Sequence, residues 1–156
     1  MIEIERKFLV RNRSYREAAV QHWEMIQGFL STNPDRVVRI RRCGNQAWIT
    51  IKGCSDAGGT TRQEWEYAIS PEDATEMLEI CLPSVIRKIR YEVPVGHHIF
   101  EVDEFQDDNQ GLILAEVELQ EEGESFPRPA WLGEEVTGKP EYYNSQLSKN
   151  PFKTWN

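Results

Sequence analysis

The sequence predicts a mainly β protein of the α+β type, whose eight antiparallel strands can close into a barrel. Apolar and polar side chains alternate along eight segments, which is typical of strands with two different faces. Short turns rich in Gly and Asn separate neighbouring segments and favour antiparallel hairpins. Helical patterns are few and short, and eight strands are enough to close a barrel.

The first strand shows the alternation most clearly. In the opening stretch MIEIERKFLV, three charged residues alternate with apolar ones, namely Glu3, Glu5 and Lys7 with Ile2, Ile4 and Phe8. After this strand at residues 2–10, the same pattern predicts strands at about 26–32, 36–43, 46–53, 61–69, 85–95, 98–106 and 112–120.

Three regions carry helical patterns instead. Residues 13–24 place apolar side chains at helical spacing. Residues 71–80 follow Ser70 as a predicted N-cap and begin with Pro71, a residue that is common at the first position of a helix. Aromatic and aliphatic residues after residue 126 predict further short helices. We expect all these helices to pack on the outside of the strands.

Charged side chains share one face on strand after strand. The cations of this face are Lys7, Arg39, Arg41, Lys52, Arg62, Lys88 and Arg90. Its anions are Glu3, Glu5, Glu64, Glu66, Glu92, Glu101, Asp103, Glu116 and Glu118. If this face is the inner one, the charges must pair with one another or bind ions. Cations suit an oligophosphate, and clustered carboxylates suit Mg²⁺ or Mn²⁺.

The alternation allows two arrangements of the barrel. In one, apolar side chains fill the interior and the charges face water. In the other, the charges line the lumen, meaning the interior of the barrel, and helices cover an apolar outer face. Bulky residues on the apolar face would overfill a narrow barrel and favour a charged lumen, namely Trp65, Tyr67, Tyr91 and Phe100. The alternation alone leaves both arrangements open.

Short motifs along the whole chain resemble the CYTH superfamily, the triphosphate tunnel metalloenzymes, and in particular its small bacterial branch. Glu-Ile-Glu-Arg-Lys at residues 3–7 resembles the E-x-E-x-K signature of that family. The other similar stretches follow in order at residues 27–31, 38–42, 50–53, 64–67, 86–91, 101–103, 114–119, 131–137 and 142–145. One short motif would be weak evidence, but an ordered series over nearly the whole chain is strong evidence.

This resemblance implies the arrangement with the charges inside. The expected fold is an eight-stranded antiparallel barrel that forms a tunnel, and residues 1–156 are expected to form a single CYTH domain. Members of the family bind triphosphate compounds together with a divalent metal. The small bacterial members are chiefly linked with hydrolysis of inorganic tripolyphosphate, so we expect a metal-dependent triphosphatase that releases pyrophosphate and phosphate.

The resemblance also implies roles for individual residues. The expected catalytic residues are Glu3, Glu5, Lys7 and Lys88. The expected phosphate ligands are Lys7, Arg39, Arg41, Lys52, Lys88 and Arg90. The expected ligands of Mg²⁺ or Mn²⁺ are Glu3, Glu5, Glu64, Glu66, Asp103, Glu116 and Glu118. Related proteins often have Tyr where this chain has Phe29, and that hydroxyl is thought to pair with the lysine matching Lys88. Phe29 has no hydroxyl, so this pairing does not carry over.

The composition restricts the partners and the compartment. The chain of 156 residues has a net charge of −8, which disfavours binding to nucleic acid. It has no apolar run long enough to cross a membrane and no export signal at its N-terminus. Three cysteines, an odd number, are expected to be reduced thiols in the cytoplasm. The expected partner is a small anionic triphosphate, and homodimer formation is left open.

Two other classes of function remain open from the sequence. One is a nucleoside or thiamine triphosphatase or an adenylyl cyclase, and the other is a polyphosphate-binding module without catalysis. The acidic residues favour an enzyme, because a simple anion binder would gain from losing those carboxylates. No stretch of the sequence is dedicated to adenine recognition, which disfavours the cyclase.

Overall fold

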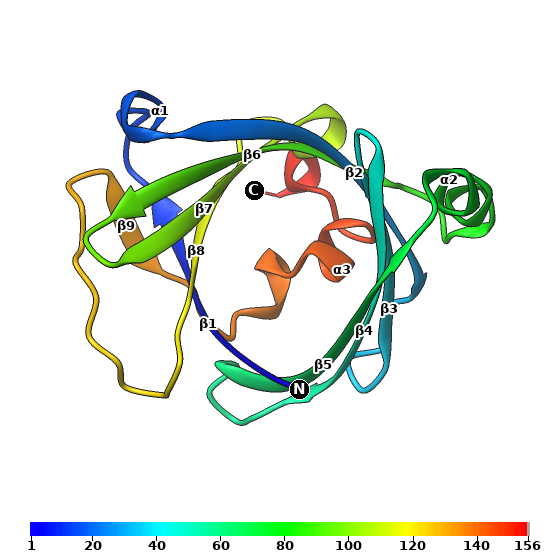
Figure 1. Ribbon diagram of the computed structural model, residues 1–156, viewed down its shortest axis with the longest axis horizontal. Helices are drawn as coiled ribbons and strands as arrows, with labels where there is room; N and C mark the ends of the chain where they lie inside the picture. Colours follow the sequence, from blue (N-terminus) through cyan, green and yellow to red (C-terminus); the bar gives the residue numbers. More distant parts are fainter. Residues whose placement is uncertain (156) are drawn as a thin grey trace.

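Eight antiparallel strands form a closed barrel in the computed structural model, which describes residues 1–155 (Figure 1). Their order around the ring is β5-β4-β3-β2-β6-β7-β8-β1, and pairing of β1 with β5 closes it. The strands are β1 (Ile2–Val10), β2 (Gln21–Ser31), β3 (Val37–Cys43), β4 (Gln46–Ser55), β5 (Thr61–Ile69), β6 (Ile86–Val95), β7 (His98–Phe105) and β8 (Ile113–Glu118). The predicted eight-stranded antiparallel barrel is confirmed.

A ninth short strand and several helices accompany the barrel. Strand β9 (Leu132–Glu135) pairs with the end of β1, so the short helix predicted for this stretch after residue 126 is wrong. The helices are α1 (Tyr15–Ala18), α2 (Pro71–Ile80), η1 (Asp107–Asn109), η2 (Pro140–Tyr142), α3 (Asn144–Leu147) and η3 (Phe152–Thr154). Helix α2 has the predicted bounds, and the Ser70 hydroxyl accepts a hydrogen bond from the Asp73 backbone N–H at 3.0 Å. No helix in the described residues is both long and apolar enough to cross a membrane.

The helix predicted at residues 13–24 is wrong over most of its length. Helix α1 covers only Tyr15–Ala18, and strand β2 begins at Gln21. Residues 21–27 pair in register with residues 86–92 of β6, so the sheet satisfies their backbone groups. Apolar side chains at helical spacing are ambiguous over such a short stretch, and the long-range pairing decides the outcome.

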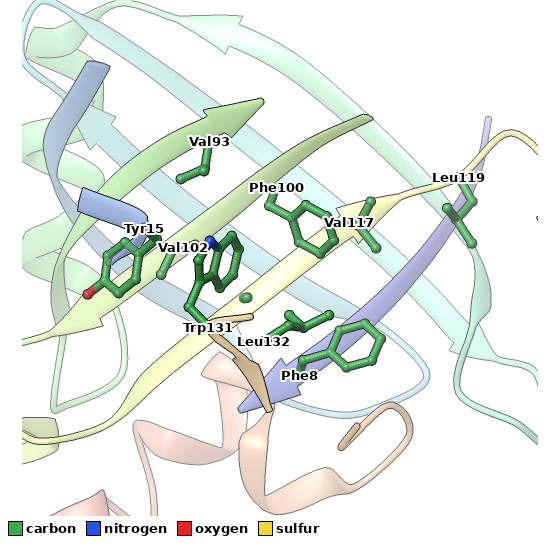
Figure 2. Packing of buried hydrophobic residues seen from close by; sticks show 10 residues of the cluster. Phe8, Tyr15, Val93, Phe100, Val102, Val117, Leu119, Trp131 and Leu132 are labelled. Atoms are coloured by element: carbon green, nitrogen blue, oxygen red, sulfur yellow. The ribbon is translucent and has the colours of Figure 1, made fainter. Parts of the chain in front are cut away.

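The outer face of the barrel is apolar and is covered at two places, whereas Trp65 and Tyr67 of β5 remain exposed. Beside β1, β7 and β8, a cluster that includes Phe8, Phe100 and Val117 packs against Trp131 and Leu132 (Figure 2). On the opposite wall, α2 covers a smaller cluster from β3 and β4 (Figure 1). Apolar side chains therefore point outward, which leaves the charged face for the lumen, and the arrangement with the charges inside is confirmed.

The C-terminal segment differs from the prediction that all helices lie outside. Helix α3 lies within the ring of strands in the view of Figure 1, and Leu147 is completely buried. Leu147 packs with inward-facing residues of several strands, namely Phe29, Val37, Ile86, Phe105 and Leu114. At this end of the barrel the inner face is apolar, so a hydrophobic segment of the chain fills it.

Two glycine turns meet where β1 leaves β5 and joins β9. The Glu5 N–H donates to the Thr60 carbonyl at 3.0 Å, and the Lys7 N–H donates to the Thr137 hydroxyl at 2.9 Å. A Cβ atom at Gly59 would lie 2.3 Å from the Gly138 Cα, and both glycines have positive φ angles. Only glycine allows this close backbone approach. We call this contact the seam of the barrel.

We predict that Gly59→Ala destabilises the protein much more than Gly44→Ala. Both glycines have positive φ, so each alanine costs about 1 kcal/mol for the left-handed conformation. At Gly44, no heavy atom of the described residues comes within 4 Å of the added Cβ, apart from Gly44 and its two chain neighbours. At Gly59 the clash with backbone adds roughly 1–3 kcal/mol. Urea unfolding of both variants measures this, and equal losses would show that the seam tolerates a Cβ.

Candidate functional site

The lumen contains a cavity of about 280 Å³ that is lined mainly by charged residues. Alternation along β1, β3, β4, β5, β6 and β8 directs these side chains inward. Twelve of the predicted site residues line it, namely Glu3, Glu5, Lys7, Arg39, Arg41, Lys52, Glu64, Glu66, Lys88, Arg90, Glu116 and Glu118. The remaining one, Asp103, is not among the lining residues. The strand pattern thus brought together nearly all the residues that the sequence analysis selected.

Several lumen cations are neutralised by neighbouring carboxylates. Lys52 Nζ lies 2.9 Å from a Glu3 oxygen, and Arg39 Nη2 lies 3.5 Å from a Glu66 oxygen. Lys7 makes a looser contact of 4.0 Å with Glu116. Each pair joins a cation and an anion of different strands. This pairing offsets the cost of burying the charges inside the barrel.

Asp103 serves two cations at once beneath the cavity surface. Its carboxylate accepts from Arg90 Nε at 2.8 Å and from Arg90 Nη2 at 2.9 Å, and Lys88 Nζ lies 2.7 Å away. Only 1% of the Asp103 residue is exposed. Burial opposes ionisation, but Arg90 and Lys88 prevail and lower the pKa of Asp103 to about 2. Burial, in turn, lowers the pKa of Lys88 to about 7.

The two arginines of β3 lack full compensation. Among residues 1–155, no carboxylate oxygen lies within 4.0 Å of the buried Arg41 guanidinium, which donates instead to the neutral Gln27 oxygen at 3.1 Å. Burial and the nearby Arg39 and Arg90 lower the pKa of Arg41. Buried Arg39 Nε also has no hydrogen-bond partner among these residues. An unpaired buried donor at Arg39 and an uncompensated positive charge at Arg41 suit a bound anion.

The acidic wall of the cavity contains two carboxyl pairs. Burial and the adjacent Glu116 raise the pKa of Glu5 well above its usual value, and the two groups share a hydrogen bond. Burial and a hydrogen bond with Glu3 raise the pKa of Glu64 to about 8. Paired carboxyl groups that share a proton can exchange it for a hard cation, and oxygen donors are what Mg²⁺ and Mn²⁺ prefer. The donor set therefore fits such a metal, although no cluster of three or more acidic, His or Cys side chains in residues 1–155 is already arranged around one.

The C-terminal segment contributes contacts that the sequence analysis did not assign. Asn144 Oδ1 accepts hydrogen bonds from Lys88 Nζ at 2.9 Å and from Gln27 Nε2 at 2.5 Å. Lys7 Nζ donates to the Tyr142 carbonyl at 3.2 Å. The stretch at residues 142–145 is one of the motifs that resemble the family, and the resemblance implies no role for it. Because it follows the last long strand, nothing in its pattern placed it in the lumen.

A comparison with family models decides the relationship. The model of the CYTH domain matches residues 1–151. The chain belongs to the CYTH family. The E-x-E-x-K stretch at its start and the charged lumen are therefore features that it shares with CYTH proteins.

Two relatives and two solved structures describe its place among CYTH proteins. An inorganic triphosphatase of Acetivibrio thermocellus is 42% identical over 154 residues, covering 98% of this chain and 97% of the relative. One of Nitrosomonas europaea is 36% identical over 157 residues, covering 95% and 97%. The crystal structure of the inorganic triphosphatase NE1496 matches with a TM-score of 0.66 and 30% identity, covering 94% and 97%. A Hippeastrum protein, a proposed adenylyl cyclase with dominant triphosphatase activity, matches with a TM-score of 0.61 over 76% of this chain and 80% of that one, and at 16% identity it shows the shared fold alone.

We predict that Glu64→Gln removes a pH-dependent loss of stability. The folded protein keeps a proton on Glu64 up to a pKa of about 8, whereas the unfolded chain releases it near the usual glutamate pKa of 4.5. Stability from this group is therefore present below pH 4.5 and falls as the pH rises to about 8, by at most about 1.4 kcal/mol per pH unit. Urea unfolding between pH 5 and 8 should give a steeper decline for the wild type than for Glu64→Gln. Parallel curves would show that Glu64 is ionised in the folded protein.

Proposed function

We propose that this protein hydrolyses inorganic tripolyphosphate to pyrophosphate and phosphate within the barrel lumen, as a single CYTH domain. The observation that carries the proposal is Arg41, which has no carboxylate within 4.0 Å among the described residues, beside Arg39, whose Nε has no hydrogen-bond partner among them, in a cavity that glutamates also line. Cations alone would suit a binding module, but the opposing carboxylates weaken anion binding and gain a purpose if they hold metal. Two relatives that are 42% and 36% identical are named inorganic triphosphatases, which supports the same activity.

The cations of the cavity would grip the phosphate chain. One side of the phosphate chain would meet donors from three strands. These are Arg39 and Arg41 from β3, Lys52 from β4, and Lys88 and Arg90 from β6. Lys7 would approach from β1, directly beside the seam. Such a cage fixes the anhydride bond in place and offsets the charge that builds up as the bond breaks.

The carboxylates would hold a divalent cation, Mg²⁺ or Mn²⁺, and orient water. We assign metal binding to Glu3, Glu5, Glu64, Glu66, Glu116 and Glu118, which all line the cavity. When bound, the metal supplies positive charge that neutralises phosphate oxygens. Asp103 is better explained as a counter-ion that holds Lys88 and Arg90, because both its oxygens are engaged and it is buried. Water would attack the terminal phosphorus atom, the bridging oxygen would leave with pyrophosphate, and the water proton would pass to a cavity carboxylate that does not hold the metal.

The same features support a cytoplasmic protein with a small anionic partner. Cys43, Cys54 and Cys81 are all free thiols, which suits a reducing compartment. The net charge of −8 disfavours a nucleic-acid partner, while the positive charges gathered in the cavity attract a small anion locally.

We predict that tripolyphosphate is the preferred substrate over ATP. The cavity of about 280 Å³ is lined mainly by charged residues that can bind phosphate, and only three of its lining residues are apolar or aromatic, namely Phe29, Val37 and Tyr143. Release of phosphate should be measured with and without Mg²⁺ for tripolyphosphate, pyrophosphate and ATP. A kcat/KM for ATP that equals or exceeds the value for tripolyphosphate would contradict the prediction.

We predict opposite effects for the acidic and basic halves of the cavity. Glu116→Gln with Glu118→Gln should nearly abolish turnover, yet preserve or strengthen metal-free binding of tripolyphosphate because two negative charges are lost. Arg39→Ala with Arg41→Ala should lose binding with or without metal, by roughly 2–5 kcal/mol for each unpaired contact. Calorimetric titration in chelator and a phosphate-release assay in Mg²⁺ measure both. Normal turnover by the glutamine pair would place the metal elsewhere.

A further inference from the structure

We propose that Asn144 is a positioning residue that orients Lys88 and, through Gln27, Arg41 for binding phosphate. This inference rests on the proposed function and deepens it, because it adds a residue of the C-terminal segment to the anion site. The sequence analysis assigns no role to the stretch at residues 142–145. Asn144 is neither one of the cations assigned to phosphate binding nor one of the carboxylates assigned to metal binding.

One amide oxygen connects two cations that come from different strands. Asn144 begins α3 inside the ring of strands, and its Oδ1 accepts from Lys88 Nζ of β6 at 2.9 Å. The same oxygen accepts from Gln27 Nε2, and Gln27 is completely buried. Gln27 Oε1 in turn accepts from Arg41 Nε of β3 at 3.1 Å. Arg41, Gln27, Asn144 and Lys88 thus form one continuous chain of hydrogen bonds.

A neutral oxygen is well suited to this position. Lysine and arginine side chains have many rotamers, and fixing each of them costs conformational entropy. A carboxylate in this position could fix them too, but it would cancel the positive charge of Arg41 and add a second negative charge beside Lys88, which already pairs with Asp103. The Asn144 amide and the Gln27 amide orient the two cations without neutralising them. This explains how Arg41 keeps a fixed direction although no carboxylate of the described residues lies within 4.0 Å of it.

The surroundings of Lys88 point to the same role. An ammonium group has three donors, and two of them meet Asp103 and Asn144. Phe29 has no hydroxyl to offer, although it also lines the cavity. With two donors held, the third is available to a ligand in the cavity that Lys88 lines. Loss of the Asn144 oxygen would free the ammonium to turn fully toward Asp103, away from a bound anion.

The competing explanation is that Asn144 only secures α3 in the end of the barrel. Leu147, on the same helix, is completely buried in the apolar cluster that fills this end. Packing of Leu147 anchors the helix without help from Asn144. A purely structural role would lower stability in Asn144 variants, but would not make their anion binding depend on the presence of Lys88.

The test is calorimetric titration of inorganic tripolyphosphate in chelator into wild type, Asn144→Ala, Lys88→Met and the double variant. We expect Asn144→Ala to weaken binding about tenfold, the size of one lost hydrogen bond to a charged group. In the Lys88→Met background the same change should weaken binding only about threefold, since only Arg41 remains to be misplaced. Gln146→Ala is the matched control on α3, because its side chain makes no hydrogen bond within residues 1–155, and it should bind like the wild type.

The outcomes separate this inference from the proposed function. If the wild type does not bind tripolyphosphate, the proposed function fails and this inference fails with it. If the wild type binds but Asn144→Ala binds equally well, or loses tenfold in both backgrounds, only the role of Asn144 is overturned. Should Asn144→Ala fail to fold by circular dichroism, Asn144→Asp keeps the shape and an acceptor oxygen. Its added negative charge beside Lys88 should weaken binding more than tenfold, and wild-type affinity in that variant would overturn the proposal.

Discussion

The structure depends on how the charges inside the barrel are compensated. An apolar outer face, covered in part by α2 and by the segment that carries Trp131 and Leu132, turns the charged faces of the strands other than β2 inward. Buried charges are costly unless they are paired, and most lumen cations have a carboxylate partner, as in the pairs of Lys52 with Glu3 and Arg90 with Asp103. Arg41 is left with a neutral partner only. That imbalance is what turns a stable barrel into a site for an anion.

The two halves of the lumen are organised differently. Apolar side chains and the C-terminal segment close one end, so the cavity is confined and its charges are partly shielded from water. Low exposure strengthens each electrostatic contact and also shifts the pKa values of Glu5, Glu64 and Lys88 away from their usual ranges. The seam of glycines, where Gly59 meets Gly138, keeps the wall continuous between β5 and β9.

Strand periodicity made much of this predictable. Because side chains alternate along a strand, the position of one charged residue fixes which other residues of that strand share its face. The motifs spread along the chain then indicated that the charged face points into the barrel. The helix expected at residues 13–24 failed because pairing of β2 with β6 joins residues far apart in sequence. The position of α3 was missed for a similar reason, since its short apolar pattern fits the inner end of a barrel as well as an outer surface. Asn144 and Gln27 are uncharged, and only the three-dimensional contacts reveal that they link Arg41 to Lys88.

The most direct test of the central claim is a crystal structure of the protein with tripolyphosphate in the presence of chelator. The account predicts a phosphate chain in the lumen, with phosphate oxygens within hydrogen-bonding distance of the Arg39 and Arg41 guanidinium groups and of Lys88 Nζ. Phosphate bound only on the outer surface, with Arg41 still bonded to Gln27 alone and the lumen free of ligand, would contradict it.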